Sequence, residues 1–168
     1  MTNTNRPIRR ALVSVFHKEG IEVLAEAFVK AGTEVVSTGS TAKKLAELGV
    51  KVTEVSDVTG FPECLDGRVK TLHPYIHAGI LADMTNPEHA KQLEEFGIKP
   101  FDLVVVNLYP FADTVRSGAN EADTIEKIDI GGISLIRAAA KNFKDVVIVP
   151  SVDQYAEFFE IIDAQHSS

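Results

Sequence analysis

Two loops of this sequence carry hydroxyl groups, a lysine and a glycine directly after short apolar runs. Ser14-Val-Phe-His-Lys18 follows the first run, and Ser37-Thr-Gly-Ser-Thr41 follows the second. If the runs are parallel strands that lead into helices, both loops lie beyond the carboxyl ends of the strands, where open α/β sheets bind ligands. A helix N-terminus there offers N–H groups to an anion, and Lys18 adds a full positive charge. Ordinary helix capping explains either loop alone equally well, but together they favour a phosphate site.

A basic segment, Asp66-Gly-Arg-Val-Lys-Thr-Leu-His-Pro74, is the second candidate. Arg68 and Lys70 alternate around one valine, so in an extended chain both side chains point to the same side. With Thr71 beside them, they could grip a phosphate or polarise a carbonyl group. A solvated surface turn is the simpler explanation, but cationic residues set between a glycine and a proline in an ordered region favour function.

A metal site receives little support. His73 and His77 are four residues apart, a spacing that can bind zinc on a helix. A proline lies between them, and no carboxylate or third ligand follows at a matching spacing. The sequence therefore predicts no metal.

Three further positions could carry chemistry. Asn107 and Tyr109 alternate at the carboxyl end of the strongest apolar run, where an amide and a phenol could hydrogen-bond a planar heterocycle. A turn fixed by the following proline is the alternative. Asp129 precedes two consecutive glycines; it could simply cap the next helix, but the glycines suggest a close approach of the backbone. Lys141 stands at the other end of that helix, a routine place for a lysine.

The elements that must position these residues alternate along the chain. Short apolar runs predict strands at residues 10–16, 34–37, 51–55, 102–108 and 146–149. Helical spacing of apolar residues predicts helices at 19–31, 41–48, 75–82, 87–96, 132–142 and 153–164, with the end of a short helix at 124–127. Residues 56–74 break this rhythm. The alternation predicts an α/β fold, a parallel sheet with helices on both faces and the 102–108 strand at its centre.

Length and composition limit the possible functions. The chain has 168 residues without repeats or a linker, which predicts one domain over 1–168 with its core at about 10–150. The net charge of −7 makes it a poor general binder of nucleic acid or anionic membranes, so an anionic ligand needs a local basic pocket. A single cysteine, no membrane-length apolar run and no apolar leader lead us to expect a cytoplasmic protein.

Seven ordered segments together resemble the IMP cyclohydrolase domain, the N-terminal part of bifunctional purine biosynthesis proteins. They lie between about Arg10 and Val149, at residues 37–41, 59–62, 67–74, 77–81, 107–111, 128–132 and 137–142. The resemblance implies a methylglyoxal-synthase-like (MGS-like) fold. It also implies closure of 5-formamidoimidazole-4-carboxamide ribonucleotide (FAICAR) to IMP with loss of water, the last step of de novo purine biosynthesis. No metal or organic cofactor is implied, and the formyltransferase domain of such proteins is absent from this sequence.

The resemblance also implies roles for individual residues. The catalytic candidates are Lys70, Tyr109, Asp129 and Lys141. The implied nucleotide contacts are Ser14, Lys18, Ser37, Thr38, Gly39, Ser40, Arg68, Thr71, Asn107, Ile130 and Gly131. A straight helix over 131–141 would hold its ends roughly 15 Å apart, so either it bends or Lys141 serves a neighbouring subunit. We therefore predict a two-fold homodimer with this alanine-rich helix near the interface.

Two other functions on the same fold remain open. A regulatory nucleotide-binding domain, as in carbamoyl phosphate synthetase, needs the phosphate loops but not Tyr109, Asp129 and Lys141 together. Methylglyoxal synthase acts on a triose phosphate with carboxylate bases, which the basic segment at 68–71 fits poorly. An assay with each substrate separates these functions.

Overall fold

The computed structural model of the chain describes residues 6–166 and contains one five-stranded parallel sheet. The strand order is β3-β2-β1-β4-β5. Their bounds are β1 (Arg10–Val15), β2 (Glu34–Ser37), β3 (Val52–Glu54), β4 (Leu103–Asn107) and β5 (Val147–Val149). The chain adds β2 and β3 on one side of β1 and then β4 and β5 on the other. The order therefore reverses between β1 and β4, which is where open α/β sheets form their ligand crevice.

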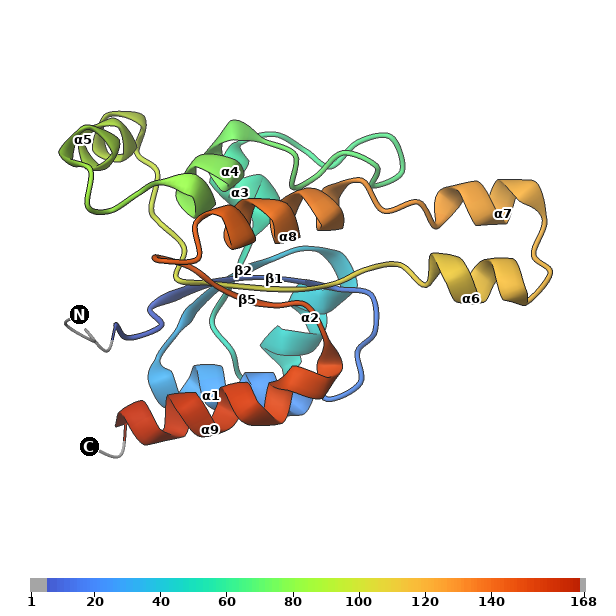
Figure 1. The fold of residues 1–168 in the computed structure, drawn as a ribbon, viewed down its shortest axis with the longest axis horizontal. Helices are drawn as coiled ribbons and strands as arrows, with labels where there is room; N and C mark the ends of the chain where they lie inside the picture. The colour runs from blue at the N-terminus through green and yellow to red at the C-terminus, as the bar shows by residue number, and fades with distance from the viewer. Residues whose placement is uncertain (1–5, 167–168) are drawn as a thin grey trace.

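Helices cover both faces of the sheet (Figure 1). One face carries α1 (Ile21–Ala31), α2 (Gly39–Glu47) and α9 (Tyr155–His166), and the other carries α3 (Val55–Thr59), α4 (Pro74–Leu81) and α8 (Gly131–Lys141). Because successive strand residues point to opposite faces, β1 contributes to two apolar cores. Val13 packs with Phe28 and Phe158 in one core, and Leu12 packs with Leu135 in the other.

The remaining helices lie at the periphery. They are α5 (Pro87–Phe96), α6 (Phe111–Arg116), α7 (Glu121–Glu126) and the short 3₁₀ helix η1 (Val152–Gln154). In Figure 1, α6 and α7 form a hairpin that projects beyond the carboxyl end of β4 and returns to α8. Every residue of α6 and α7 is at least partly exposed. The hairpin thus contributes no side chain to either apolar core.

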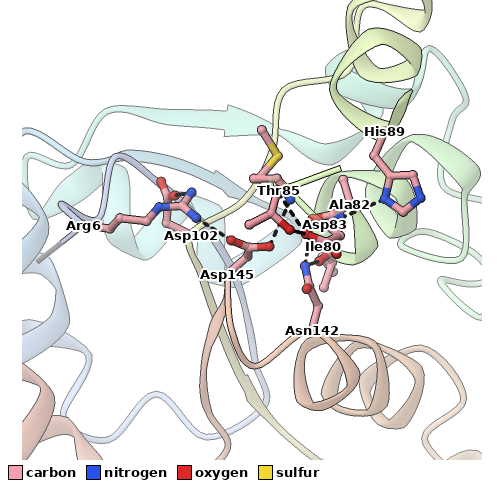
Figure 2. A network of polar contacts seen from close by, with 10 residues as sticks. Arg6, Ile80, Ala82, Asp83, Thr85, His89, Asp102, Asn142 and Asp145 are labelled. Atoms are coloured by element: carbon pink, nitrogen blue, oxygen red, sulfur yellow. Dashed lines mark hydrogen bonds and ion pairs between the residues drawn. The ribbon is translucent and has the colours of Figure 1, made fainter. Parts of the chain in front are cut away.

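Polar contacts tie the amino ends of the strands to the far end of α8 (Figure 2). The Arg6 guanidinium lies 2.6 Å from a carboxylate oxygen of Asp145. The side-chain nitrogen of Asn142 donates to the carbonyl oxygens of Ile80 and Ala82 at 2.8 and 2.9 Å. These bonds fix the C-terminal end of α8 against the end of α4, so the opposite end of α8 has a defined position at the carboxyl side of the sheet.

Most predicted elements are confirmed, and the differences have simple causes. The strand at 34–37 and the helix at 87–96 have the predicted bounds, whereas α2 begins at Gly39, two residues earlier than predicted. Helices α3 and α6 were not predicted, because five or six residues are too few to show helical periodicity and α6 buries no side chain. The strand predicted at the centre of the sheet is β4, which is fully buried, but the middle strand is its neighbour β1.

Candidate functional site

A cavity of about 630 Å³ lies at the carboxyl ends of β1 and β4. Its walls come from five segments: the loop after β1, the first turn of α2, the basic segment at 66–72, the end of β4, and residues 125–132, which run from the last residues of α7 into the first turn of α8. The cavity therefore occupies the crevice that the reversal of strand order creates.

The cavity gathers nearly all of the residues predicted for binding or catalysis. The lining includes Ser14, Lys18, Thr38, Gly39, Ser40, Arg68, Lys70, Thr71, Asn107, Tyr109, Asp129, Ile130 and Gly131. Ser37 and Lys141 do not line it. The Ser37 hydroxyl donates instead to the carbonyl of Val13 at 2.6 Å inside the sheet, and Lys141 lies exposed at the far end of the continuous helix α8. The Ser37 side chain therefore lies outside the cavity lining, and the nucleotide contact that the sequence predicts at Ser37 stays a prediction.

The part of the cavity at α2 is electropositive. Among the described residues, no side chain caps the first amides of α2, and its N-cap Thr38 has extended backbone. The Lys18 ammonium group is held by the carbonyl oxygens of Val15 and Phe16. Burial, and then repulsion from Lys70, lowers the pKa of Lys18 below its ordinary value. Two lysines and a helix N-terminus thus face one space, an arrangement that suits a phosphate group.

We expect the affinity for a nucleoside 5′-monophosphate to fall at alkaline pH as Lys18 loses its proton. The protonated lysine binds the anion, and because its pKa is lowered, the charge disappears at a pH below the ordinary 10.5. A bound phosphate restores the charge, so binding takes up protons in that pH range. Calorimetry in buffers of different ionisation enthalpy measures this uptake.

The matched substitutions for this measurement are Lys18→Met and Lys51→Met. Lys51 is exposed and precedes β3 at the opposite end of the sheet. Lys18→Met should lose affinity by on the order of tenfold and should lose the proton uptake, whereas Lys51→Met should change neither. Unchanged uptake in Lys18→Met would assign the titration to another group.

The basic segment owes its shape to a tight turn. Cys64 and Val69 exchange backbone hydrogen bonds of 3.2 and 3.4 Å, and Leu65 and Asp66 between them have φ values of 53° and 55°. Gly67 follows at φ 82°, and a Cβ there would come within 2.7 Å of a carboxylate oxygen of Glu63. The turn leads into Arg68 and Lys70, which both line the cavity, and Arg68 forms an ion pair with Glu126 of the 125–132 segment.

Asp129 joins the end of β4 to the start of α8. One of its carboxylate oxygens accepts from the Gly132 amide at 2.7 Å, and the other accepts from the Tyr109 amide at 3.3 Å. A Cβ on Gly132 would come within 2.7 Å of this carboxylate, and one on Gly131 would lie 3.0 Å from the Thr71 hydroxyl. The two glycines therefore permit the close approach that the sequence suggested, to Asp129 and to the basic segment.

Asn107 lines the cavity, but its amide group holds the neighbouring loop. The Asn107 oxygen accepts from the amides of Phe16 and His17 at 2.6 and 3.0 Å. Its nitrogen donates to the His17 carbonyl at 3.3 Å and lies 3.5 Å from the Tyr155 hydroxyl. Burial raises the pKa of Tyr155, against the opposing effect of this hydrogen bond. Asn107 thus fixes the loop that presents Lys18.

Four polar residues of the lining were not among the predicted site residues: Thr41, Asp66, Glu126 and Lys127. The Thr41 hydroxyl donates to the Val15 carbonyl at 3.1 Å, which ties α2 to the end of β1. The Lys127 ammonium nitrogen lies 5.1 and 5.8 Å from the ring centroids of Phe16 and Tyr109. The sequence signal that could have indicated Lys127 was its place two residues before Asp129. A lysine at the end of a short exposed helix is common, however, so this place alone does not indicate a site residue.

The described residues also bear on metal and membrane binding. Among residues 6–166, no three His, Cys, Asp or Glu side chains gather in a way that could hold a metal ion. His73 instead accepts from the Tyr75 amide at 3.1 Å and so caps α4. None of the helices in the same range has the length and apolarity that a membrane span requires.

Comparisons with known proteins agree with the fold and point to a family. The sequence profile of the MGS-like domain matches residues 20–134. The bifunctional purine biosynthesis protein PurH of Cutibacterium acnes is 62% identical over 152 residues, which make up 90% of this chain and 30% of that protein. The PurH proteins of Corynebacterium glutamicum and Mycobacterium ulcerans are 56% and 59% identical, over 96% and 89% of this chain and 31% and 29% of theirs.

A solved structure is also similar. The crystal structure of ForH superposes with a TM-score of 0.79 at 31% sequence identity, covering 95% of this chain and 82% of that one. The chain thus matches this structure over most of both lengths, whereas it spans only about 30% of the length of the curated relatives.

Proposed function

Because the chain belongs to the family of MGS-like domains, we propose that it is an IMP cyclohydrolase that closes FAICAR to IMP. One observation carries the proposal: a single cavity combines the electropositive end at α2 with Lys70, Tyr109 and Asp129. A regulatory domain needs only the first of these features. The high identity to proteins named for purine biosynthesis supports the same assignment. Since the chain spans less than a third of those proteins, the proposal concerns the cyclohydrolase activity and not formyl transfer.

The reaction requires a weak nucleophile to attack a formyl carbon. In our proposal the phosphate of FAICAR binds at the first turn of α2 beside Lys18, which fixes the nucleotide so that its carboxamide nitrogen meets the formyl carbon. Asp129 takes the proton that the nitrogen releases as the C–N bond forms. Its carboxylate is already held by the amides of Gly132 and Tyr109, so its position is fixed.

The formyl oxygen becomes negative as the new bond forms. Lys70, half-buried in the cavity wall, stabilises this oxyanion, and the Tyr109 hydroxyl donates a second hydrogen bond. This oxygen leaves as water after it has gained two protons, one of which is the proton that Asp129 took from the carboxamide nitrogen. Loss of the formamide N–H proton then leaves the C=N bond of the purine and restores the proton supplied by the second donor. Lys141 is the proposed donor for the departing water.

The proposed function is tested by turnover of FAICAR to IMP, followed by absorbance and chromatography. We expect turnover with a chelator present and without an added cofactor, and no reaction with 5-aminoimidazole-4-carboxamide ribonucleotide plus a formyl-folate. Nucleotide binding without turnover would support the regulatory alternative, and production of methylglyoxal from dihydroxyacetone phosphate would support the lyase.

The position of Lys141 leads us to propose a homodimer in which this lysine serves the partner's cavity. Helix α8 is continuous, so its eleven residues hold Lys141 about 15 Å from the cavity end of the helix. Ala140, Lys141 and Phe143 are exposed at that end, which leaves them available to a second subunit. We also propose a cytoplasmic location, where a single free cysteine stays reduced.

Mixing two inactive variants tests this arrangement. We expect Lys70→Ala and Lys141→Ala homodimers to be inactive alone but to recover about one quarter of wild-type turnover after exchange of subunits. Half of the mixed dimers are then heterodimers, and each has one cavity with both lysines intact. If native mass spectrometry shows exchange of subunits but turnover does not recover, Lys141 does not act in the partner's cavity. An active monomer in sedimentation would lead to the same conclusion.

A further inference from the structure

The cavity contains a cation that the proposed reaction has not used. Lys127 follows α7 directly and lines the cavity from the 125–132 segment. Its ammonium nitrogen lies over two aromatic rings, 5.1 Å from the Phe16 centroid and 5.8 Å from the Tyr109 centroid. The two rings themselves meet edge to face, with centroids 5.4 Å apart and planes at 76°. We call these three residues the Phe16–Tyr109–Lys127 cluster.

The charge of Lys127 is not neutralised by a neighbouring carboxylate. The adjacent Glu126 pairs with Arg68, and among the ion pairs of the described residues none includes Lys127. A half-buried ammonium group over a ring face is attracted by the ring's electron density, and partial removal from water strengthens the attraction. The aromatic rings are thus the partners that the structure gives to this lysine.

The cluster also completes the restraints on Tyr109. The Tyr109 amide is held by Asp129, its ring packs edge to face with the ring of Phe16, and the Lys127 ammonium group lies over the ring. The contacts come from two segments, the loop after β1 and the 125–132 segment, and they act on the backbone and the ring of Tyr109, so together they fix the direction of the phenol. Of the three, the contact with Lys127 can be removed by a substitution that leaves both aromatic rings and the Asp129 carboxylate in place.

We propose that Lys127 is a positioning residue that holds the Tyr109 ring so that its hydroxyl faces the reacting atoms. This inference rests on the proposed function. Lys127 acts through Tyr109, so its removal slows the chemical step and leaves the phosphate end of the cavity intact. The α7–α8 connection thereby becomes part of the site, although the exposed hairpin that precedes it has no buried residue.

The first test is independent of turnover. In the full chain labelled with ¹³C-lysine, ring currents should shift the ε-methylene protons of Lys127 upfield of those of exposed lysines such as Lys91, which pairs with Glu95. The substitution Tyr109→Leu should move the resonance toward the ordinary position. A Lys127 resonance at the ordinary position in the unaltered protein would overturn the proposal, whether or not the chain turns over FAICAR.

The second test measures how Lys127 and Tyr109 depend on each other. Lys127→Met should lower kcat by roughly fivefold to twentyfold with KM for FAICAR changed less than about twofold, and Lys127→Arg should restore most of the rate. In a Tyr109→Phe background, Lys127→Met should cost less than about twofold, because the hydroxyl that it positions is already gone. Lys91→Met is the control.

Equal losses in both backgrounds, or a loss confined to KM, would show that Lys127 acts on the substrate directly and would overturn the positioning role. Absence of turnover in the unaltered chain would sink the proposed function and leave the first test standing.

Discussion

Lys70→Ala is expected to lower turnover of FAICAR by roughly two to three orders of magnitude and to leave the protein folded. Lys70 is half-buried in the basic segment, outside both apolar cores, so its removal creates no core cavity. The loss follows from its place beside the electropositive end of the cavity: the developing oxyanion would have to be stabilised without a full positive charge. Steady-state kinetics, with circular dichroism to confirm the fold, measures the effect.

Two further variants make this result specific. Lys144→Ala removes a lysine that is exposed at the opposite end of the sheet, and it should leave turnover unchanged. In Lys70→Ala, millimolar concentrations of a small primary amine should restore part of the lost rate by supplying the missing cation. A Lys70→Ala variant that keeps turnover within a few-fold would show that the oxyanion is stabilised elsewhere.

Much of this cavity could be predicted from the sequence because the fold constrains it strongly. Parallel strands bring their carboxyl ends to one edge, so the segments after β1, β2 and β4 had to meet once the strands were recognised. Lys18 lies between β1 and α1, and Asp129 stands two residues before α8, so the fold itself places both at the carboxyl edge of the sheet. The basic segment was recognised from its alternating cations, because its backbone shape has no periodic signal, and the family resemblance added the catalytic role of Lys70.

What escaped prediction depends on local geometry that periodicity does not carry. Ser37 is the last residue of β2, and its hydroxyl bonds to the neighbouring strand β1. Thr41, four residues later, lines the cavity. Lys127 enters the site because the α6–α7 hairpin returns to the body of the protein at that point. The hairpin itself has no buried side chain, so no apolar pattern indicated where it turns back.

The second large effect is expected at Asp129, which has a structural and a proposed chemical role. Asp129→Asn should lower turnover by about two to four orders of magnitude, because an amide cannot take the proton that the carboxamide nitrogen releases. The asparagine oxygen can still accept from the Gly132 amide, and only the longer contact with the Tyr109 amide is lost, so the free energy of unfolding should change by less than about 1 kcal/mol. Asp129→Ala should lose turnover to a similar extent and, in addition, about 1–2 kcal/mol of stability from the lost contact at the first turn of α8.

Comparing Asp129→Asn with Asp129→Ala separates the structural role of Asp129 from its proposed role as a base. Any aspartate that caps a helix has the structural role, but only a base needs the carboxylate for turnover. Asp113→Asn, which alters a carboxylate that is 77% exposed on α6, should change neither turnover nor stability. If Asp129 were only a cap, turnover of the variants would follow their stability, and Asp129→Asn would remain within about fivefold of the unaltered protein. A turnover loss that is equally large in Asp129→Asn and Asp129→Ala, despite their different stabilities, requires the carboxylate itself. Because the same carboxylate also accepts from the Tyr109 amide, the residue that builds the wall of the cavity is, in the proposed mechanism, also its base.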